Sequence, residues 1–192
     1  AQIQQHGQLM QVQRIDKRAK TRNPVAPFTT STLQQEAVRK LGFTTDRVMR
    51  TAQQLYEGVA AGEGTVGLIT YMRTDSVALA NEAVQEIRAY IGQNYSKDYL
   101  PAQANVYKNK SKNAQEAHEA IRPTSIERTP DAVRPYLTPE QAKLYEMIWK
   151  RTLACQMTPA KFDTVGVDLA VNNQADHVFR ASGQTLVFPG FI

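Results

Sequence analysis

The sequence predicts an α+β protein in which a mainly helical domain, residues 25–160, is inserted between the two halves of a β-rich domain, residues 1–24 and 161–192. Three observations predict it. The central residues repeat apolar side chains at the spacing of an α-helix. The last residues alternate apolar and polar side chains, as a half-buried strand does, and a stretch near the N-terminus also favours a strand. The β structure therefore stands at both ends of the chain.

Length and composition restrict the function classes. A chain of 192 residues can bury one sizeable core, or one domain with part of another. Its 42% hydrophobic and 21% charged residues are those of a folded globular protein rather than a disordered one. The net charge of +5 is compatible with an anionic partner such as nucleic acid, but many basic proteins bind no such partner.

Cysteine usage and hydropathy indicate a soluble, cytoplasmic protein. The single cysteine, Cys155, cannot form an internal disulfide, and its apolar neighbours predict a buried, inert thiol rather than a nucleophile. No stretch approaches the roughly 20 apolar residues that span a bilayer, and the glutamine-rich N-terminus has no signal-peptide core. The chain begins with Ala1 instead of Met, which suggests that it was cut from a longer protein.

The first half of the chain contains signals for one strand and three helices. Residues 7–15 favour a strand, and the basic stretch from 17 to 27 predicts a linker. Ser31 with Gln34 suggests a capping box, and Gly42 ends that helix. Thr45 opens a second helix, which ends in a run of glycines from Gly58. Residues 66–72 predict an extended segment, and Ser76 is expected to cap a third helix that ends before residue 92.

In the second half, residues 92–111 predict a loop and residues 114–121 a short helix. Pro123 ends this helix, because the residue before a proline avoids the α region. The clearest helix start is Thr138-Pro139-Glu140-Gln141, with Thr138 as N-cap, and this helix should reach about Met157. Residues 164–171 and 177–188 then predict two strands, joined by a turn at the adjacent asparagines 172 and 173.

Tyr71 and Arg73 form the first candidate site. Side chains two apart on an extended segment point the same way, so both would face one site. A phenol, with a pKa of about 10, is a poor nucleophile, and a neighbouring guanidinium favours the phenolate and pairs with phosphate oxygens. Attack on a phosphodiester would store the bond energy in a phosphotyrosine. The spacing alone, however, favours an ordinary packing tyrosine.

Two further clusters carry groups that suit a phosphate. His118 and Arg122 would share a face of the predicted helix, although a surface turn in which Glu119 or Glu116 pairs with Arg122 explains them better. The stretch from Pro27 contains hydroxyl and amide side chains that can either hold a nucleic-acid phosphate or cap a helix. Its candidate DNA-binding residues are Thr30, Ser31, Thr32 and Gln35.

Together, these motifs identify a family. Residues 67–76, Gly-Leu-Ile-Thr-Tyr-Met-Arg-Thr-Asp-Ser, resemble the active-site tyrosine motif of type IA DNA topoisomerases. Residues 27–35, 115–123 and 154–160 also resemble that family and occur in its order, and the resemblance is close over residues 25–163. Met72, after the tyrosine, is similar to bacterial topoisomerase I, since topoisomerase III usually has proline there.

The resemblance implies a function for each cluster. Tyr71 would be the nucleophile that forms a 5′-phosphotyrosine on one DNA strand, and Arg73 would position the scissile phosphate. His118 would contact a DNA phosphate, with Arg122 assisting. The family's helical domain III carries the tyrosine and is attached to a β-rich arch, domain II, which opens to pass a strand and so relaxes negative supercoils. Such a protein acts on DNA, preferably single-stranded, in the cytoplasm at the nucleoid.

The sequence also departs from the family pattern. The family binds Mg²⁺ through an Asp-x-Asp motif in a Toprim domain, and no Asp-x-Asp occurs in these 192 residues. A single cysteine likewise excludes a four-cysteine zinc site within them, so we assign no metal ligand and no cofactor to this chain. Without the Toprim domain as a partner, we expect the chain alone not to relax supercoiled DNA.

Two other function classes compete with this hypothesis. One is a single-stranded nucleic-acid-binding module in which Tyr71 stacks on bases without catalysis. The other is a tyrosine recombinase, which the chain resembles neither in motif nor in the position of the tyrosine. Covalent trapping through Tyr71 separates the enzyme from the binding module. The polarity of the adduct separates it from the recombinases, which leave a 3′-phosphotyrosine.

Overall fold

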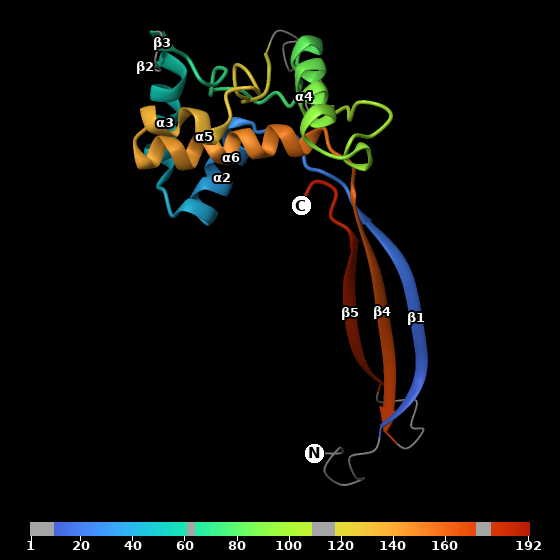
Figure 1. The fold of residues 1–192 in the computed structure, drawn as a ribbon. Helices are drawn as coiled ribbons and strands as arrows, with labels where there is room; N and C mark the ends of the chain where they lie inside the picture. Colours follow the sequence, from blue (N-terminus) through green and yellow to red (C-terminus); the bar gives the residue numbers. More distant parts are fainter. Residues whose placement is uncertain (1–9, 61–63, 109–117, 172–177) are drawn as a thin grey trace. The chain divides into compact units, whose positions relative to one another are not determined.

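The structure is a computed structural model that describes residues 10–60, 64–108, 118–171 and 178–192 (Figure 1). Its contacts divide the chain into two compact units. Unit 1 comprises residues 1–23, 159–190 and 192, and unit 2 comprises residues 24–158 and 191. Both helix and sheet are therefore present, as the sequence predicts, and no described helix is long and apolar enough to cross a membrane.

Unit 1 is an antiparallel sheet of three long strands, with β4 in the middle (Figure 1). The strands are β1 (Met10–Arg22), β4 (Ala160–Val171) and β5 (Val178–Phe188). The strands expected near residues 164–171 and 177–188 are thus confirmed, whereas the turn expected at residues 172 and 173 lies outside the described residues. The linker was expected over residues 17–27. This prediction is wrong for residues 17–22, which belong to β1 and pair with β4.

The two faces of this sheet differ in polarity. Arg14, Asp168 and Arg180 lie opposite one another, and Arg180 binds the Asp168 carboxylate through two nitrogens at 2.7 and 2.9 Å. Those hydrogen bonds lower the pKa of Asp168. Cross-strand partners share a face, so the alternate residues form the opposite face, which is apolar near Val12 and Ile15 and also carries Lys17 and Asp163 further along the strands. That face contains Val12, Ile15, Val167, Leu169, Phe179 and Ala181.

Unit 2 is mainly helical. Its elements are α2 (Thr30–Leu41), α3 (Thr45–Glu57), β2 (Val59–Ala60), β3 (Thr65–Val66), α4 (Asn81–Asn94), η1 (Lys97–Tyr99), α5 (Pro130–Val133), η2 (Arg134–Tyr136) and α6 (Pro139–Cys155). The described hydrophobic core lies in this unit, and α6 contributes Leu144, Tyr145, Ile148, Trp149 and Leu153 to it. Two polar atoms of these side chains find backbone acceptors, Trp149 Nε1 at the Ile126 carbonyl and Tyr145 Oη at the Arg128 carbonyl.

Helix ends follow local signals where no tertiary contact competes. Thr138 caps α6, and Gln141 completes a capping box with it, as predicted. Gly42 ends α2 in the left-handed conformation, with φ 67°. The capping box expected at Ser31 is wrong by two residues, because Thr29 is the N-cap of α2 and pairs with Thr32.

Two segments that were expected to be helical are not helical. The helix expected from Ser76 begins only at Asn81, and the Ser76 hydroxyl accepts a hydrogen bond from the amide of Ala78 in a turn. In the helix expected over residues 114–121, residues 114–117 lie outside the described residues and 118–121 are not helical. Their backbone amides form long-range hydrogen bonds instead of helical ones: the amide of Ala120 donates to the carbonyl of Ala78, and the amide of Ile121 donates to the carbonyl of Phe28.

The two ends of unit 2 lie close together. The phenol of the half-buried Tyr107 donates to the carbonyl oxygen of Cys155 at 2.8 Å and also lies 3.3 Å from that of Pro24. Burial raises the pKa of Tyr107, so the phenol keeps its proton and remains a donor. One side chain therefore links the first residue of the unit to the end of α6.

Candidate active site

The segment that carries Tyr71 is fixed on one side by residues 120–124. The amide of Thr70 donates to the carbonyl of Arg122 at 2.9 Å, and the amide of Thr124 donates to that of Leu68 at 3.0 Å. The Thr70 hydroxyl adds a bond to the carbonyl of Ala120 at 2.7 Å and accepts one from the amide of Arg122 at 3.0 Å. Backbone hydrogen bonds around an antiparallel bridge between Ile69 and Pro123 thus join the tyrosine motif to the motif at residues 115–123.

The other side of the segment is fixed by Thr30, the first residue of α2. Its hydroxyl lies 2.7 Å from the carbonyl oxygen of Met72 and 3.1 Å from that of Thr74, and it accepts a bond from the amide of Thr74 at 2.8 Å. Three of the four motifs that the sequence singled out, residues 27–35, 67–76 and 115–123, therefore meet around residues 68–74. Thr30 was expected to bind DNA, but its hydroxyl is directed at the backbone of the tyrosine segment.

Exposure alternates along this segment. Met72 and Thr74 are buried, whereas Tyr71 and Arg73 are exposed, with 45% of Tyr71 accessible to solvent. This is the alternation that an extended segment produces. The tyrosine and the arginine therefore lie on the solvent side of a backbone that hydrogen bonds hold at both flanks, where a macromolecular substrate can reach them.

A second tyrosine, which the sequence analysis did not single out, lies against Tyr71. The rings of Tyr56 and Tyr71 meet edge to face, with centroids 5.3 Å apart and planes at 65°. Tyr56 is near the C-terminal end of α3, and the amide of Leu68 donates to the carbonyl of Leu55 at 2.8 Å. The sequence gives only a weak signal for this contact. The two tyrosines come together because β2 and β3 pair and bring the segment after β3 back beside α3.

The second predicted cluster is arranged differently from the expectation. His118 is exposed, but the helical face that it was to share with Arg122 does not exist, because residues 118–122 are not helical. Arg122 is half-buried, and its Nε donates to Glu119 at 2.6 Å while its Nη1 donates to the carbonyl of Pro123 at 3.0 Å. The predicted Glu119–Arg122 pair is therefore confirmed, so this guanidinium is already engaged.

The hydroxyl cluster at the start of α2 serves mainly in capping. Thr32 hydrogen-bonds Thr29, and the hydroxyl of Ser31 lies 3.1 Å from that of Thr29. Ser31 and Gln35 are exposed and line a shallow groove of about 380 Å³ together with Gln34, Val38, Arg39 and Thr45. Of the four residues predicted to bind DNA here, Ser31, Thr32 and Gln35 are exposed and Thr30 is half-buried.

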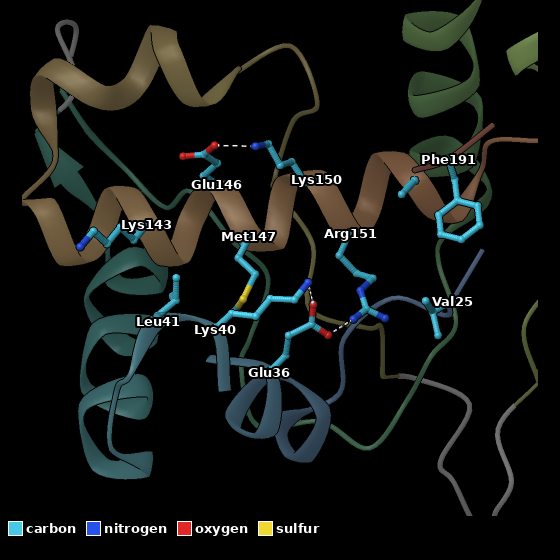
Figure 2. A pocket seen from close by; sticks show the side chains of 11 residues that line it. Val25, Glu36, Lys40, Leu41, Lys143, Glu146, Met147, Lys150, Arg151 and Phe191 are labelled. Carbon is cyan, nitrogen blue, oxygen red and sulfur yellow. Dashed lines mark hydrogen bonds and ion pairs between the residues drawn. The ribbon is translucent and has the colours of Figure 1, made fainter. Parts of the chain in front are cut away.

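A larger cavity lies away from the tyrosine. It measures about 460 Å³ between α2 and α6, and Figure 2 shows Glu36 in it, with ion pairs to Lys40 and Arg151. Burial opposes ionisation of Glu36, but the hydrogen bond from Lys40 and the charge of Arg151 outweigh it and lower the pKa. Arg151 also lies over the Phe28 ring at 4.4 Å. We assign this cluster to the packing of α6 on α2.

The metal that the resemblance implies has no ligand set in the described part of the chain. Among those residues, no three histidine, cysteine, aspartate or glutamate side chains come close enough together to hold an ion. Asp75, two residues from Arg73, has an exposed side chain.

Comparison with known proteins identifies the family. A family model described as DNA topoisomerase matches residues 1–192. The chain belongs to this family. DNA topoisomerase 1 of Xylella fastidiosa strain Temecula1 is 59% identical over 179 residues, which are 93% of this chain and 22% of that protein. DNA topoisomerase 1 of Rickettsia felis is 53% identical over 180 residues, 94% of this chain and 23% of that protein.

A solved structure of the same family has the same fold. Full-length topoisomerase I from Thermotoga maritima matches 95% of this chain with a TM-score of 0.83 and 38% sequence identity, and the match covers 29% of that chain. The family inferred from the four motifs is thus confirmed. The chain spans less than a third of the length of these topoisomerases, so what the whole proteins do is not automatically a property of this chain.

Proposed function

We propose that this chain carries the nucleophile of a type IA DNA topoisomerase, and that Tyr71 cleaves one DNA strand. The phenol oxygen attacks the phosphorus of a phosphodiester and loses its proton. The bond from phosphorus to the 3′ oxygen breaks, and that oxygen takes up a proton. The products are a 5′-phosphotyrosine and a free 3′-hydroxyl, and the reverse reaction reseals the strand without ATP.

The observation that supports this best is the setting of Tyr71. Its side chain is exposed, while hydrogen bonds from Thr30 and Thr70 fix the backbone on both sides. A nucleophile that must meet a large polymer has to be accessible, and catalysis by approach and orientation requires it to be held in place. An ordinary packing tyrosine would need neither property.

The other site residues take distinct parts in the proposal. Arg73, exposed beside Tyr71, pairs with oxygens of the scissile phosphate. His118, also exposed, binds a neighbouring phosphate of the strand, and Ser31 and Gln35 bind it further along α2. Thr30, Thr32 and Arg122 already bind other groups of the chain, so they act by positioning these residues.

The wider activity depends on parts that this chain does not contain. We assign unit 2 to the family's helical domain III and unit 1 to part of its β-rich domain II. In the complete enzyme a Toprim domain supplies Mg²⁺ close to the phosphate, and strand passage relaxes negative supercoils. The chain by itself is therefore inactive in relaxation, and it prefers single-stranded DNA, with an affinity that falls as salt is raised.

The deciding experiment is covalent trapping. The chain is mixed with Mg²⁺, a Toprim-containing remainder of a relative, and a single-stranded oligonucleotide labelled at its 3′ end. A 5′-phosphotyrosine leaves that label on the protein in a denaturing gel, whereas an oligonucleotide labelled at its 5′ end leaves no labelled protein. Tyr71→Phe should abolish the band. Tyr136→Phe, which alters a tyrosine of similar exposure (47%), should not.

Three other results of the trapping and relaxation experiments would contradict parts of the proposal. A band that carries the 5′ label would indicate the opposite polarity and contradict the proposal. DNA binding without any adduct, although the two parts are shown to associate, would favour the noncatalytic binding module. Relaxation of supercoiled DNA by the chain alone would disprove the need for the Toprim domain.

A further inference from the structure

We propose that Tyr56 is a positioning residue for Tyr71, and that its ring holds the nucleophile's ring in the orientation for attack. The inference rests on the proposed function for its catalytic consequence. Its structural part, the restraint of one ring by the other, stands separately and can be measured separately. Neither the family comparison nor the sequence motifs assign any function to Tyr56.

The geometry is that of a specific aromatic contact. The ring centroids are 5.3 Å apart and the planes meet at 65°, which is the edge-to-face arrangement that aromatic quadrupoles favour. Both side chains are partly exposed, 41% for Tyr56 and 45% for Tyr71. Among the described residues, Tyr56 is the aromatic partner of Tyr71, so its ring is placed to restrain the orientation of the Tyr71 ring.

The backbone around Tyr56 is built to hold this contact. The carbonyl of Leu55, next to Tyr56, accepts the amide of Leu68 at 2.8 Å. Gly67 approaches so closely that a Cβ atom there would stand 2.7 Å from the carbonyl oxygen of Tyr56. The end of α3 and the start of the tyrosine segment are thus in direct backbone contact, which fixes the base of both aromatic side chains relative to each other.

The consequence for catalysis follows from orientation. The hydrogen bonds of Thr30 and Thr70 fix the backbone on each side of Tyr71 but leave the side-chain torsions of an exposed residue free. A ring that rotates among rotamers is correctly placed only part of the time, and the rate of attack falls by that fraction. The energy typical of an aromatic pair corresponds to roughly a 2- to 12-fold effect on rate.

The experiment compares Tyr56→Leu and Tyr56→Phe in the full chain. Phenylalanine keeps the ring contact and leucine removes it. Tyr95→Leu is the matched control, because Tyr95 is also exposed and forms a ring pair, with Tyr99 at 5.8 Å, elsewhere in unit 2. Two quantities are measured: the single-turnover rate of adduct formation in the trapping mixture, and the NMR signal of the Tyr71 ring after labelling with fluorotyrosine.

We expect Tyr56→Leu to slow adduct formation about 2- to 12-fold with unchanged affinity for the oligonucleotide. Its Tyr71 signal should move towards the value of a free tyrosine as the ring-current effect is lost. Tyr56→Phe should retain both the rate and the signal, and Tyr95→Leu should affect neither. The unfolding midpoint of each variant shows whether it is folded, and Tyr56→Gln is the substitute if the leucine variant is not.

Several outcomes would overturn the inference. A folded Tyr56→Leu protein with the parent's rate and the parent's Tyr71 signal would show that the contact restrains nothing. Equal losses in the phenylalanine and leucine variants would assign the effect to the Tyr56 hydroxyl and not to its ring. If Tyr71→Phe still forms the adduct, the proposed function fails instead, and the NMR signal alone then decides whether Tyr56 orders the Tyr71 ring.

Discussion

Thr30 and Thr74 are joined by a reciprocal pair of hydrogen bonds. The amide of Thr30 donates to the carbonyl of Thr74 at 2.9 Å, and the amide of Thr74 donates to the Thr30 hydroxyl at 2.8 Å. The same hydroxyl lies 2.7 Å from the carbonyl oxygen of Met72. The first turn of α2 thereby acts as the anchor of the segment that carries Tyr71.

Replacing Thr30 by valine should therefore destabilise this anchor. The substitution keeps the shape of the side chain but leaves half-buried backbone groups of residues 72–74 without a partner, which costs about 1–3 kcal/mol. Urea unfolding measures the loss, and adduct formation should slow as well. Ser31→Ala, which alters the neighbouring exposed hydroxyl, should stay within about 0.5 kcal/mol of the parent. Equal stability of the two variants would contradict the anchoring function.

The Glu36 carboxylate should make stability depend on acid pH. Its pKa is lower in the folded chain than the ordinary 4.5, because Lys40 and Arg151 outweigh the effect of burial. As the pH falls, Glu36 therefore takes up its proton at a higher pH in the unfolded chain than in the folded chain. The stabilisation from this group is complete above the unfolded pKa and is lost as the pH falls from about 4.5 through the lower folded value.

Glu36→Gln should consequently flatten the stability profile below pH 5 and lower stability at neutral pH. Thermal unfolding between pH 3 and 7 provides the comparison. Glu127→Gln, which alters an exposed carboxylate, is the control for the substitution itself and should change stability at neutral pH by less than about 0.5 kcal/mol. A Glu36→Gln protein with the same acid dependence as the parent would show that the pairs with Lys40 and Arg151 contribute no net stability.

Gly67→Ala should disturb the tyrosine segment by steric contact. The added methyl would stand 2.7 Å from the carbonyl oxygen of Tyr56, so either α3 or the segment must move, at a cost of about 1–3 kcal/mol. Gly183→Ala in β5 is the matched control, because nothing lies within 4 Å of the added atom. Denaturant titrations of the two variants should differ, with only the first less stable than the parent.

Cys155 should be unreactive until the chain unfolds. It is fully buried, and burial raises the pKa of its thiol to about 12 although Gln156 and Arg151 act in the opposite direction. Since the thiolate is the reactive form, a disulfide reagent at pH 8 should modify the folded chain slowly and the chain in denaturant at once. Rapid reaction of the folded chain would mean that the C-terminal end of α6 opens readily.

The sequence predicted best the features that short-range signals determine. Thr138 and Gln141 form their capping box because an N-cap needs only residues within one turn. Gly42 ends α2 for a similarly local reason. The alternation around Tyr71 was also predicted, since an extended segment is the local preference of its β-branched neighbours. In these places local preference and tertiary structure agree.

The features that the sequence missed depend on distant partners. The amides of Ala120 and Ile121 bind carbonyls of Ala78 and Phe28, and no pattern within 114–121 reveals that. Arg22 belongs to a strand because Ala160 pairs with it, not because of its own neighbours. The contact of Tyr56 with Tyr71 likewise arises only when the β2–β3 hairpin has formed.

Tyr107 has a consequence for the order of folding. Its phenol brings the carbonyls of Pro24 and Cys155 to within 3.3 and 2.8 Å of one oxygen, so the helical unit closes on itself. The pairing of β1 with β4 joins residues as distant as Arg22 and Ala160, which in an unfolded chain requires closing a long loop. A helical unit that has already folded shortens that loop to a few residues. The kinetic nucleus is therefore expected among the helices, with the sheet forming last.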